Sequence, residues 1–327
     1  MTKYRHHLPQ LDGGLFLTDG GMETTLIFRE KIDLPCFAAF DLLKDQRGAD
    51  ILLGYYARHA AIARESGAGF ILDSATWRAN PDWAEKLGYS PRELDVANAR
   101  AINMLFDLRA AHETATSPMV ISGCVGPRGD GYDPGVLMSP REAMVYHSRQ
   151  IGIFATAGVD LVTAYTLNNT NEAIGVTRAA REAGLPVAIS FTLETDGRLP
   201  TGEALRDAIR FVDHATDSGP AYYMIDCAHP THFEQALDDD DWMARLRGIR
   251  ANASRRSHAE LDEAADLDDG DPVELGRQYR DLRARFPHIN VLGGCCGTDH
   301  RHIEQICRNC GQADIVARNR FINESGG

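Results

Sequence analysis

Short apolar segments alternate with longer amphipathic segments along most of the 327-residue chain. Eight apolar runs that end in small or polar residues predict strands: Leu15–Asp19, Phe70–Asp73, Met119–Cys124, Val159–Ala164, Val187–Phe191, Tyr222–Cys227, Arg247–Ala251 and Asn290–Gly294. Clear helical spacing follows in Ile51–Ser66, Glu172–Ala183 and Thr201–Thr216. Strands alternating with helices predict a parallel α/β sheet, and eight such units fit a closed (βα)₈ TIM barrel.

No low-complexity linker divides the chain, so we expect residues 1–327 to form one barrel domain. The segment after the seventh predicted strand, residues 251–272, is acidic and lacks clear periodicity. We interpret this acidic loop as a long excursion on the catalytic rim of the barrel, mobile without ligand. The alternative is a solvated excursion without function.

Polar motifs follow six of the predicted strands: Asp19–Gly21, Asp73–Thr76, Gly126–Pro127, Thr163–Asn169, Asp226–Cys227 and Cys295–Cys296. A parallel barrel gathers the carboxyl ends of its strands at one face. We therefore expect residues that are far apart in the sequence to meet there and to form a site.

Composition narrows the range of partners. The formal net charge is −13, and an acidic surface repels phosphate backbones and anionic lipid, which argues against nucleic-acid and membrane partners. No apolar run approaches the roughly 20 residues that span a bilayer, and the first residues lack the apolar stretch of a signal peptide. We expect a cytoplasmic protein. These features are also compatible with a homo-oligomer.

Two of the seven cysteines, Cys295 and Cys296, are adjacent in a glycine-rich turn. Adjacent side chains normally diverge, and flanking glycines permit the irregular backbone that would let both bind one ion. Cys227, at the end of the sixth strand, would complete three thiolate ligands for zinc and leave the fourth position open for substrate. A helix that starts after Thr298 would point its dipole at this turn and favour thiolate over thiol.

The remaining cysteines admit other interpretations. We expect Cys36 and Cys124 to be buried packing residues, as free cysteines commonly are. Cys307 and Cys310 form a C-x-x-C pair near the end of the last predicted helix. An alternative places them with Cys295 and Cys296 in a closed structural site.

The motif Gly293–Thr298, the strand-end Cys227 and the segment Thr18–Thr24 resemble the homocysteine S-methyltransferase family. Two further segments, Gly123–Pro127 and Thr76–Asn80, resemble its third-strand and second-strand motifs. The resemblance runs nearly end to end. It implies a (βα)₈ barrel that binds zinc through Cys227, Cys295 and Cys296 and activates a thiol for methyl transfer.

The resemblance also implies a pocket for the thiol substrate. Asp19 would hold the substrate ammonium, and its alternative role is to cap a helix starting at Met22. The family commonly has glutamate where this chain has Tyr165, and asparagine where it has Asp226. These differences put homocysteine itself in question. Further polar residues that would compensate are Thr166, Asn168 and Glu194, so the predicted substrate-binding residues are Asp19, Tyr165, Thr166 and Glu194.

The predicted activity is zinc-dependent transfer of a methyl group from a small onium donor to a thiol, with homocysteine giving methionine. Tyr165 and Trp77 would offer cation–π faces to the donor, although aromatic residues are more often part of a core. His59 and His147 lie in helical stretches without ligand spacing and are interpreted as core or surface histidines. Two alternatives stay open: a zinc hydrolase, and a non-enzymatic zinc- or redox-responsive protein with a diverged site.

Overall fold

The computed structural model describes residues 2–264 and 266–311. Its centre is a closed barrel in which the eight strands pair in parallel in sequence order, from β1 round to β8 and back to β1. The strands are β1 (Phe16–Leu17), β2 (Gly69–Asp73), β3 (Met119–Val125), β4 (Leu161–Leu167), β5 (Val187–Thr192), β6 (Tyr222–Asp226), β7 (Leu246–Ala251) and β8 (Val291–Gly294). The prediction of a (βα)₈ barrel is confirmed, and each predicted strand overlaps an observed one.

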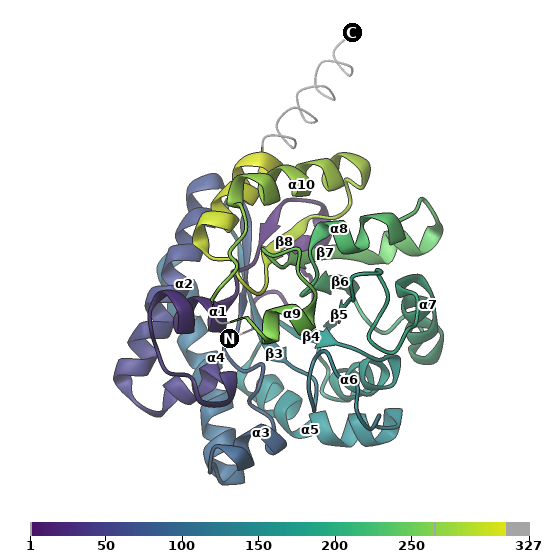
Figure 1. Cartoon of the computed structure of the whole chain (residues 1–327). Coiled ribbons are helices and arrows are strands. Elements are labelled where there is room, and N and C mark those ends of the chain that lie inside the picture. Colours follow the sequence, from purple (N-terminus) through teal and green to yellow (C-terminus); the bar gives the residue numbers. More distant parts are fainter. Residues whose placement is uncertain (1, 265, 312–327) are drawn as a thin grey trace.

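The longer helices form an outer ring around the strands, whereas the short α9 lies over the barrel mouth (Figure 1). The helices are α1 (Met22–Thr24), α2 (Gln46–Ser66), α3 (Pro81–Lys86), α4 (Pro91–His112), α5 (Pro140–Ala157), α6 (Thr170–Glu182), α7 (Leu205–Thr216), α8 (Pro230–Phe233), α9 (His258–Asp262) and α10 (Pro272–Arg285). Residues 300–311 form a further helix after β8. Short 3₁₀ or π turns cover Pro9–Asp12, Thr25–Arg29, Pro35–Phe37, Ala39–Lys44, Glu234–Ala236 and Asp241–Arg245. None of the helices in the described part of the chain combines the length and apolar character needed to cross a bilayer.

Local capping sets several helix starts. Ser90 and Ser139 each form a capping box with the glutamate three residues later, at the start of α4 and α5. Asp45 caps α2, which therefore begins at Gln46, five residues before the predicted Ile51. The predicted helix from Thr201 begins only at Leu205, because the preceding residues form turns.

Two apolar layers stabilise the barrel. The larger lies between the outward faces of the strands and the helices, as expected when both faces of a parallel sheet are covered. A smaller cluster fills the barrel interior and includes Phe16, Ile71, Val120 and Tyr222. Leu8, from the segment before β1, also joins it. With one end of the barrel filled in this way, the carboxyl ends of the strands form an open mouth.

Candidate active site at the barrel mouth

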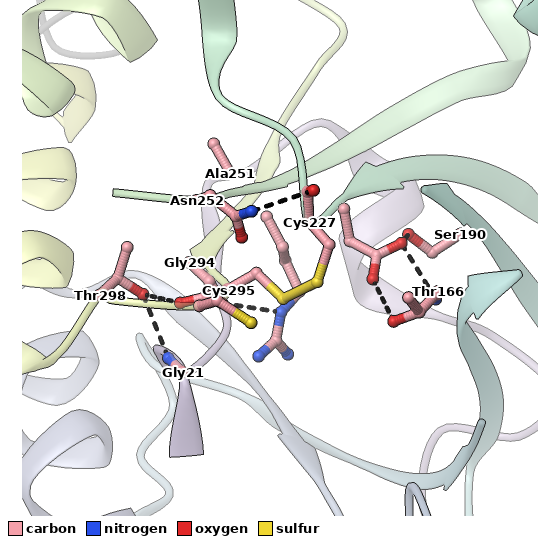
Figure 2. The surroundings of a disulfide bond; sticks show 12 residues. Gly21, Thr166, Ser190, Cys227, Ala251, Asn252, Gly294, Cys295 and Thr298 are labelled. Carbon is pink, nitrogen blue, oxygen red and sulfur yellow. Dashed lines mark hydrogen bonds between the residues drawn. A yellow bond between two sulfur atoms is a disulfide. The ribbon is translucent and has the colours of Figure 1, made fainter. Parts of the chain in front are cut away.

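Three cysteines converge at the barrel mouth. Cys227 follows β6, Cys295 and Cys296 follow β8, and their sulfur atoms all lie within 4.8 Å of one another. Figure 2 shows Cys227 and Cys295 joined by a disulfide, with Asn252 beside them. This is the one group of three or more metal-ligating side chains found within residues 2–264 and 266–311. We call these three residues the cysteine cluster.

The backbone around the cysteine cluster is irregular on both sides. Cys227 has a φ of 53°, in the left-handed region that non-glycine residues rarely occupy. Its carbonyl accepts a hydrogen bond from Asn252 Nδ2 at 3.0 Å, which helps hold this conformation. Within β8, a Cβ at Gly293 would overlap the Thr18 hydroxyl, and in the turn that follows β8 Gly297 has a φ of 80°. The glycines are therefore required by contact and conformation, as the motif predicts.

The thiol of Cys296 remains hard to ionise in this setting. Burial raises the pKa of Cys296 to about 11, and the nearby Glu23 adds to the effect. A hydrogen bond with the Tyr132 hydroxyl, at 3.8 Å from the sulfur, acts in the opposite direction. The expectation that the following helix favours thiolate is therefore outweighed by burial, and a cation at the cluster would be needed to hold thiolates at neutral pH.

The cysteine cluster lines a cavity of about 440 Å³ at the barrel mouth. Three of the four predicted substrate residues, Asp19, Tyr165 and Thr166, also line it. Glu194 is not among the described residues that do, and it lies half-buried beyond the end of β5. The structure thus brings Asp19, Tyr165 and Thr166 together with the cysteines and leaves Glu194 outside.

An arginine that the sequence analysis missed organises the polar end of this cavity. Arg250, at the end of β7, is only 8% exposed. Its Nη2 lies 2.7 Å from Asp19 Oδ1, and its Nη1 donates to Asp73 Oδ2 at 3.2 Å. Its Nε donates to the Gly294 carbonyl at 3.1 Å, directly before the cysteine turn. Arg250 lies within the predicted seventh strand, and it gave no signal in the sequence because arginine is usually exposed.

Tyr165 belongs to the same group of side chains. Its hydroxyl donates to Asp73 Oδ2 at 2.7 Å, and the Arg250 guanidinium lies over its ring, 4.6 Å from the centroid. We call Asp19, Asp73, Tyr165 and Arg250 the charge network. Since Arg250 covers one face of the Tyr165 ring, that face is taken by the protein's own cation rather than presented to an onium donor.

Electrostatics of the charge network follow from burial and pairing. Burial raises the pKa of Asp73 to about 6, although Arg250 acts to lower it. Burial also acts against the charge on Arg250, but Asp19 and the other network members raise its pKa well above the usual value. The alternative role of Asp19 as a helix cap is wrong, because α1 is preceded by Gly21 and shows no side-chain cap.

Asp226, the second departure from the family pattern, is tied into the strand ends. It accepts hydrogen bonds from the Thr166 backbone N–H at 3.1 Å, the Thr166 hydroxyl at 2.8 Å and the Ser190 hydroxyl at 2.6 Å. Thr166 has a φ of 58° within β4. All three bonds come from donors, so this position needs a side chain that only accepts hydrogen bonds, as an ionised carboxylate does. The same bonds hold the irregular backbone of Thr166.

The acidic loop reaches over the cavity. It contains α9, and His258 and Leu261 of this helix line the cavity together with Asp268. The His258 ring stacks on Tyr132 with centroids 3.8 Å apart, and Tyr132 comes from the loop after β3. The position of the acidic loop on the rim therefore agrees with the prediction for the part of the loop that the structure describes. Residue 265 lies outside the described residues.

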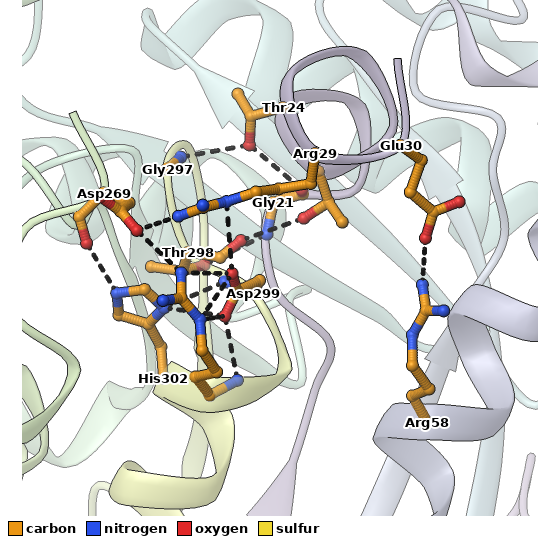
Figure 3. Close-up of polar contacts among 12 residues, drawn as sticks. Gly21, Thr24, Arg29, Glu30, Arg58, Asp269, Gly297, Thr298, Asp299 and His302 are labelled. Atoms are coloured by element: carbon orange, nitrogen blue, oxygen red, sulfur yellow. Dashed lines mark hydrogen bonds and ion pairs between the residues drawn. The ribbon is translucent and has the colours of Figure 1, made fainter. Parts of the chain in front are cut away.

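Ion pairs fasten the far end of the acidic loop beside the cysteine turn (Figure 3). Asp269 is paired with both Arg29 and Arg301, and its carbonyl lies 2.8 Å from His302 Nε2. Although burial acts to raise it, hydrogen bonds from His302 and Arg301 hold the pKa of Asp299 below its usual range. The loop is thus anchored to the helix that follows β8.

The predictions for the cysteines outside the cluster have different outcomes. Cys124 is buried as expected, but Cys36 is exposed, so its prediction as a packing residue is wrong. It lies in the turn Pro35–Phe37 with a φ of 55°, where no neighbour covers the side chain. Cys307 and Cys310 are buried in the helix of residues 300–311, apart from the cysteine cluster.

The two histidines that we interpreted as core or surface residues belong to the core. His59 and His147 are each about 1% exposed. Neither lines the cavity in the described part of the chain.

The second predicted cation–π residue, Trp77, lines the cavity and lies against Arg78. The Arg78 guanidinium is 4.9 Å from the Trp77 ring centroid and 3.9 Å from that of Trp83. Phe28 and Phe37 line the same region. This side of the cavity therefore combines aromatic faces with one cation.

Comparisons with known proteins agree with this arrangement. The model of the homocysteine S-methyltransferase family matches residues 16–310. The homocysteine S-methyltransferase 4 of Zea mays is 23% identical over 273 residues, which cover 76% of this chain and 78% of the maize protein.

Solved structures show the same fold. The oxidised form of the homocysteine methyltransferase MmuM from Escherichia coli has a TM-score of 0.71 at 18% identity, covering 91% of this chain and 97% of that one. Its metallated form has a TM-score of 0.66 at 18% identity and covers 90% and 96%. With a family match that spans the barrel from β1 to the helix after β8, this chain belongs to the homocysteine S-methyltransferase family.

Proposed function

We propose that this protein is a zinc-dependent S-methyltransferase that moves a methyl group from a small onium donor to a thiol, homocysteine giving methionine. The observation that carries the proposal is the convergence of three cysteine sulfurs on a cavity large enough for small molecules. Family membership supports the same activity.

The donor set suits zinc. Three sulfurs within 4.8 Å of one another match the three protein ligands of a catalytic zinc site with one open position. A bound zinc ion would hold a substrate thiol as thiolate at neutral pH, although a free thiol has a pKa of about 8.5. Cys227, Cys295 and Cys296 would hold the ion, and the disulfide between the first two must be reduced before they can do so.

The remaining residues bind and orient the thiol. Asp19, next to the cysteine turn, would accept hydrogen bonds from the substrate ammonium, and Arg250 fixes its carboxylate at 2.7 Å. The stacked pair of Tyr132 and His258 covers the sulfur of Cys296 and limits access of water. Tyr165 does not supply a carboxylate, but its hydroxyl fixes Asp73 in the same network.

The test is mass spectrometry of the products when reduced, zinc-loaded protein meets homocysteine and a panel of onium donors. We expect methionine from homocysteine with at least one donor, and none after zinc removal. A zinc hydrolase would normally use histidine or carboxylate ligands, and the described group contains thiols alone. Bound zinc with no methyl transfer to any thiol would favour the non-enzymatic alternative.

A further inference from the structure

The hydroxyl of Tyr132 reaches one sulfur of the cysteine cluster. Tyr132 lies in the loop after β3 and lines the cavity, and its hydroxyl oxygen is 3.8 Å from Cys296 Sγ. No other side chain in the described part of the chain donates to this sulfur. A tyrosine hydroxyl, with an ordinary pKa of about 10, keeps its proton at neutral pH and therefore acts as the donor to an ionised sulfur.

The backbone of the loop after β3 is fastened to the end of β4. Asn168 donates from Nδ2 to the carbonyls of Asp130, at 2.9 Å, and Gly131, at 3.2 Å. A Cβ at Gly131 would meet the Thr166 side chain at 2.5 Å, so the loop passes closely over this strand end. Asn168 is not among the described residues that line the cavity. It acts on the site through the loop that carries Tyr132.

The ring of Tyr132 is held by the acidic loop. The His258 ring of α9 stacks on it, with centroids 3.8 Å apart and ring planes inclined by 20°. His258 Nε2 in turn lies 3.3 Å from the carbonyl of Leu193, just beyond β5. Packing that locks the rotamer of a side chain also fixes the direction of the polar group that it carries. The hydroxyl of Tyr132 is thus directed at Cys296 by contacts from three separate segments.

We infer that Tyr132 is a positioning residue for the metal site. When the cysteine cluster holds a metal ion, the Tyr132 hydroxyl donates a hydrogen bond to the Cys296 thiolate, and His258 of the acidic loop keeps the hydroxyl in place. This inference rests on the proposed function, which assigns zinc to the cluster. The bond withdraws part of the negative charge that three thiolates place around one ion. Partners that hydrogen-bond to metal ligands typically account for about 10–100-fold in metal affinity.

The experiment examines the metal site without catalysis. Tyr132→Phe keeps the ring and removes the hydroxyl, and His258→Ala removes the stacking partner. Tyr89→Phe is the matched control, because the Tyr89 hydroxyl donates to Asp41 Oδ1 at 2.9 Å and neither residue is among those that line the cavity in the described part of the chain. Reduced protein is titrated with zinc in competition with a chromophoric chelator. It is also titrated with cobalt(II), whose thiolate charge-transfer band reports the electron density on the sulfur ligands.

We expect Tyr132→Phe to bind zinc about tenfold more weakly than the wild type. Its cobalt charge-transfer band should move to longer wavelength, because the thiolate electrons lie higher in energy without the hydrogen bond. His258→Ala should show both changes to a smaller degree, and Tyr89→Phe should show neither. Thermal unfolding of the metal-free variants confirms that each is folded.

Two results would overturn the inference. If Tyr132→Phe keeps the zinc affinity of the wild type, the hydroxyl does not support the metal site. If Tyr132→Phe loses affinity while its cobalt band stays in place, Tyr132 acts through packing alone and the hydrogen bond is rejected. A wild-type spectrum and affinity in His258→Ala would reject the part that the inference assigns to the acidic loop.

An assay of methyl transfer keeps the inference distinct from the proposed function. If Tyr132→Phe shows the expected metal affinity and cobalt band but the wild type methylates no thiol, the methyltransferase proposal fails and the role of Tyr132 stands. If the wild type methylates homocysteine while Tyr132→Phe matches it in zinc affinity and cobalt spectrum, the proposed function stands and the inference fails.

Discussion

The cavity joins two regions that are built in different ways. The cysteine cluster depends on backbone: a left-handed Cys227, a turn whose glycines make close contacts, and a carbonyl held by Asn252. The charge network depends on side chains from three strands and from the segment after β1, which hold one another through ion pairs and hydrogen bonds. In the proposed function the first would supply the chemistry, and the second would set recognition of the thiol substrate.

Arg250 shows how such a network changes. Tyr165 stands where the family commonly has glutamate, and a cation on β7 balances the carboxylates of Asp19 and Asp73. Removing Arg250 would leave the buried carboxylates of Asp19 and Asp73 without their cation, which costs several kcal/mol. The members of the charge network therefore depend on one another, and the sequence difference at Tyr165 has to be understood together with Asp73 and Arg250.

The largest effect is expected in the cysteine cluster. Replacing Cys227, Cys295 or Cys296 by Ala should abolish both zinc binding and methyl transfer, because two thiolates do not hold an open zinc site tightly. Zinc is measured by atomic absorption on reduced protein. Cys36→Ser and Cys307→Ser are the controls and should keep full zinc. If the Cys296→Ala variant retains full zinc, Cys296 is not a zinc ligand.

In the charge network, the largest effect should come from Arg250→Met. The change leaves Asp19 and Asp73 buried without their cation, so the free energy of unfolding should fall by about 3–5 kcal/mol. Urea unfolding measures it. Arg149→Met, at an exposed ion pair with Asp95, should cost about 1 kcal/mol or less. Equal costs for the two variants would show that Arg250 is not the centre of a buried network.

A smaller effect concerns Glu23 and pH in the zinc-free protein. Burial raises the pKa of Glu23 to about 7, so the folded state binds its proton more tightly than the unfolded state does. Its contribution to stability therefore falls as pH rises from the unfolded value of about 4.3 towards 7. Glu23→Gln should be more stable than the wild type by about 3 kcal/mol at pH 8, since each unit of pKa difference corresponds to about 1.4 kcal/mol, and nearly equally stable at pH 4. A difference that is constant across pH would contradict the raised pKa.

The smallest effect is expected in the acidic loop. Asp269→Asn removes its ion pairs with Arg29 and Arg301, which are partly exposed, so amide exchange in the loop should become about fivefold faster. Hydrogen exchange with mass spectrometry measures this, and Asp95→Asn on α4 serves as the control. Binding of thiol and donor together should slow exchange in the wild type. If neither Asp269→Asn nor the bound ligands change the rate of amide exchange, the loop is a solvated excursion without function.

The sequence predicted the barrel and the cysteine cluster because both leave local signals. Alternating apolar and amphipathic segments repeat eight times, and the paired cysteines lie between glycines whose spacing is required by the turn. The charge network was only partly visible: Asp19 and Tyr165 were predicted to bind substrate and Asp73 was recognised as part of a strand-end polar motif, whereas Arg250 was not identified. The pairing of Asp73 with Arg250 joins β2 to β7, 177 residues apart, and no local pattern records such a contact. Cys36 was misjudged for a related reason, since burial depends on neighbours that the sequence does not place.

The central claim is that the cysteine cluster holds zinc with one position open for the substrate thiol. X-ray absorption at the zinc edge, on reduced and zinc-loaded protein, measures the number of sulfur ligands directly. We predict three sulfur ligands at about 2.3 Å in the free protein and four after homocysteine is added. A sulfur count that stays unchanged on adding homocysteine, or zinc bound through nitrogen and oxygen alone, would contradict the account.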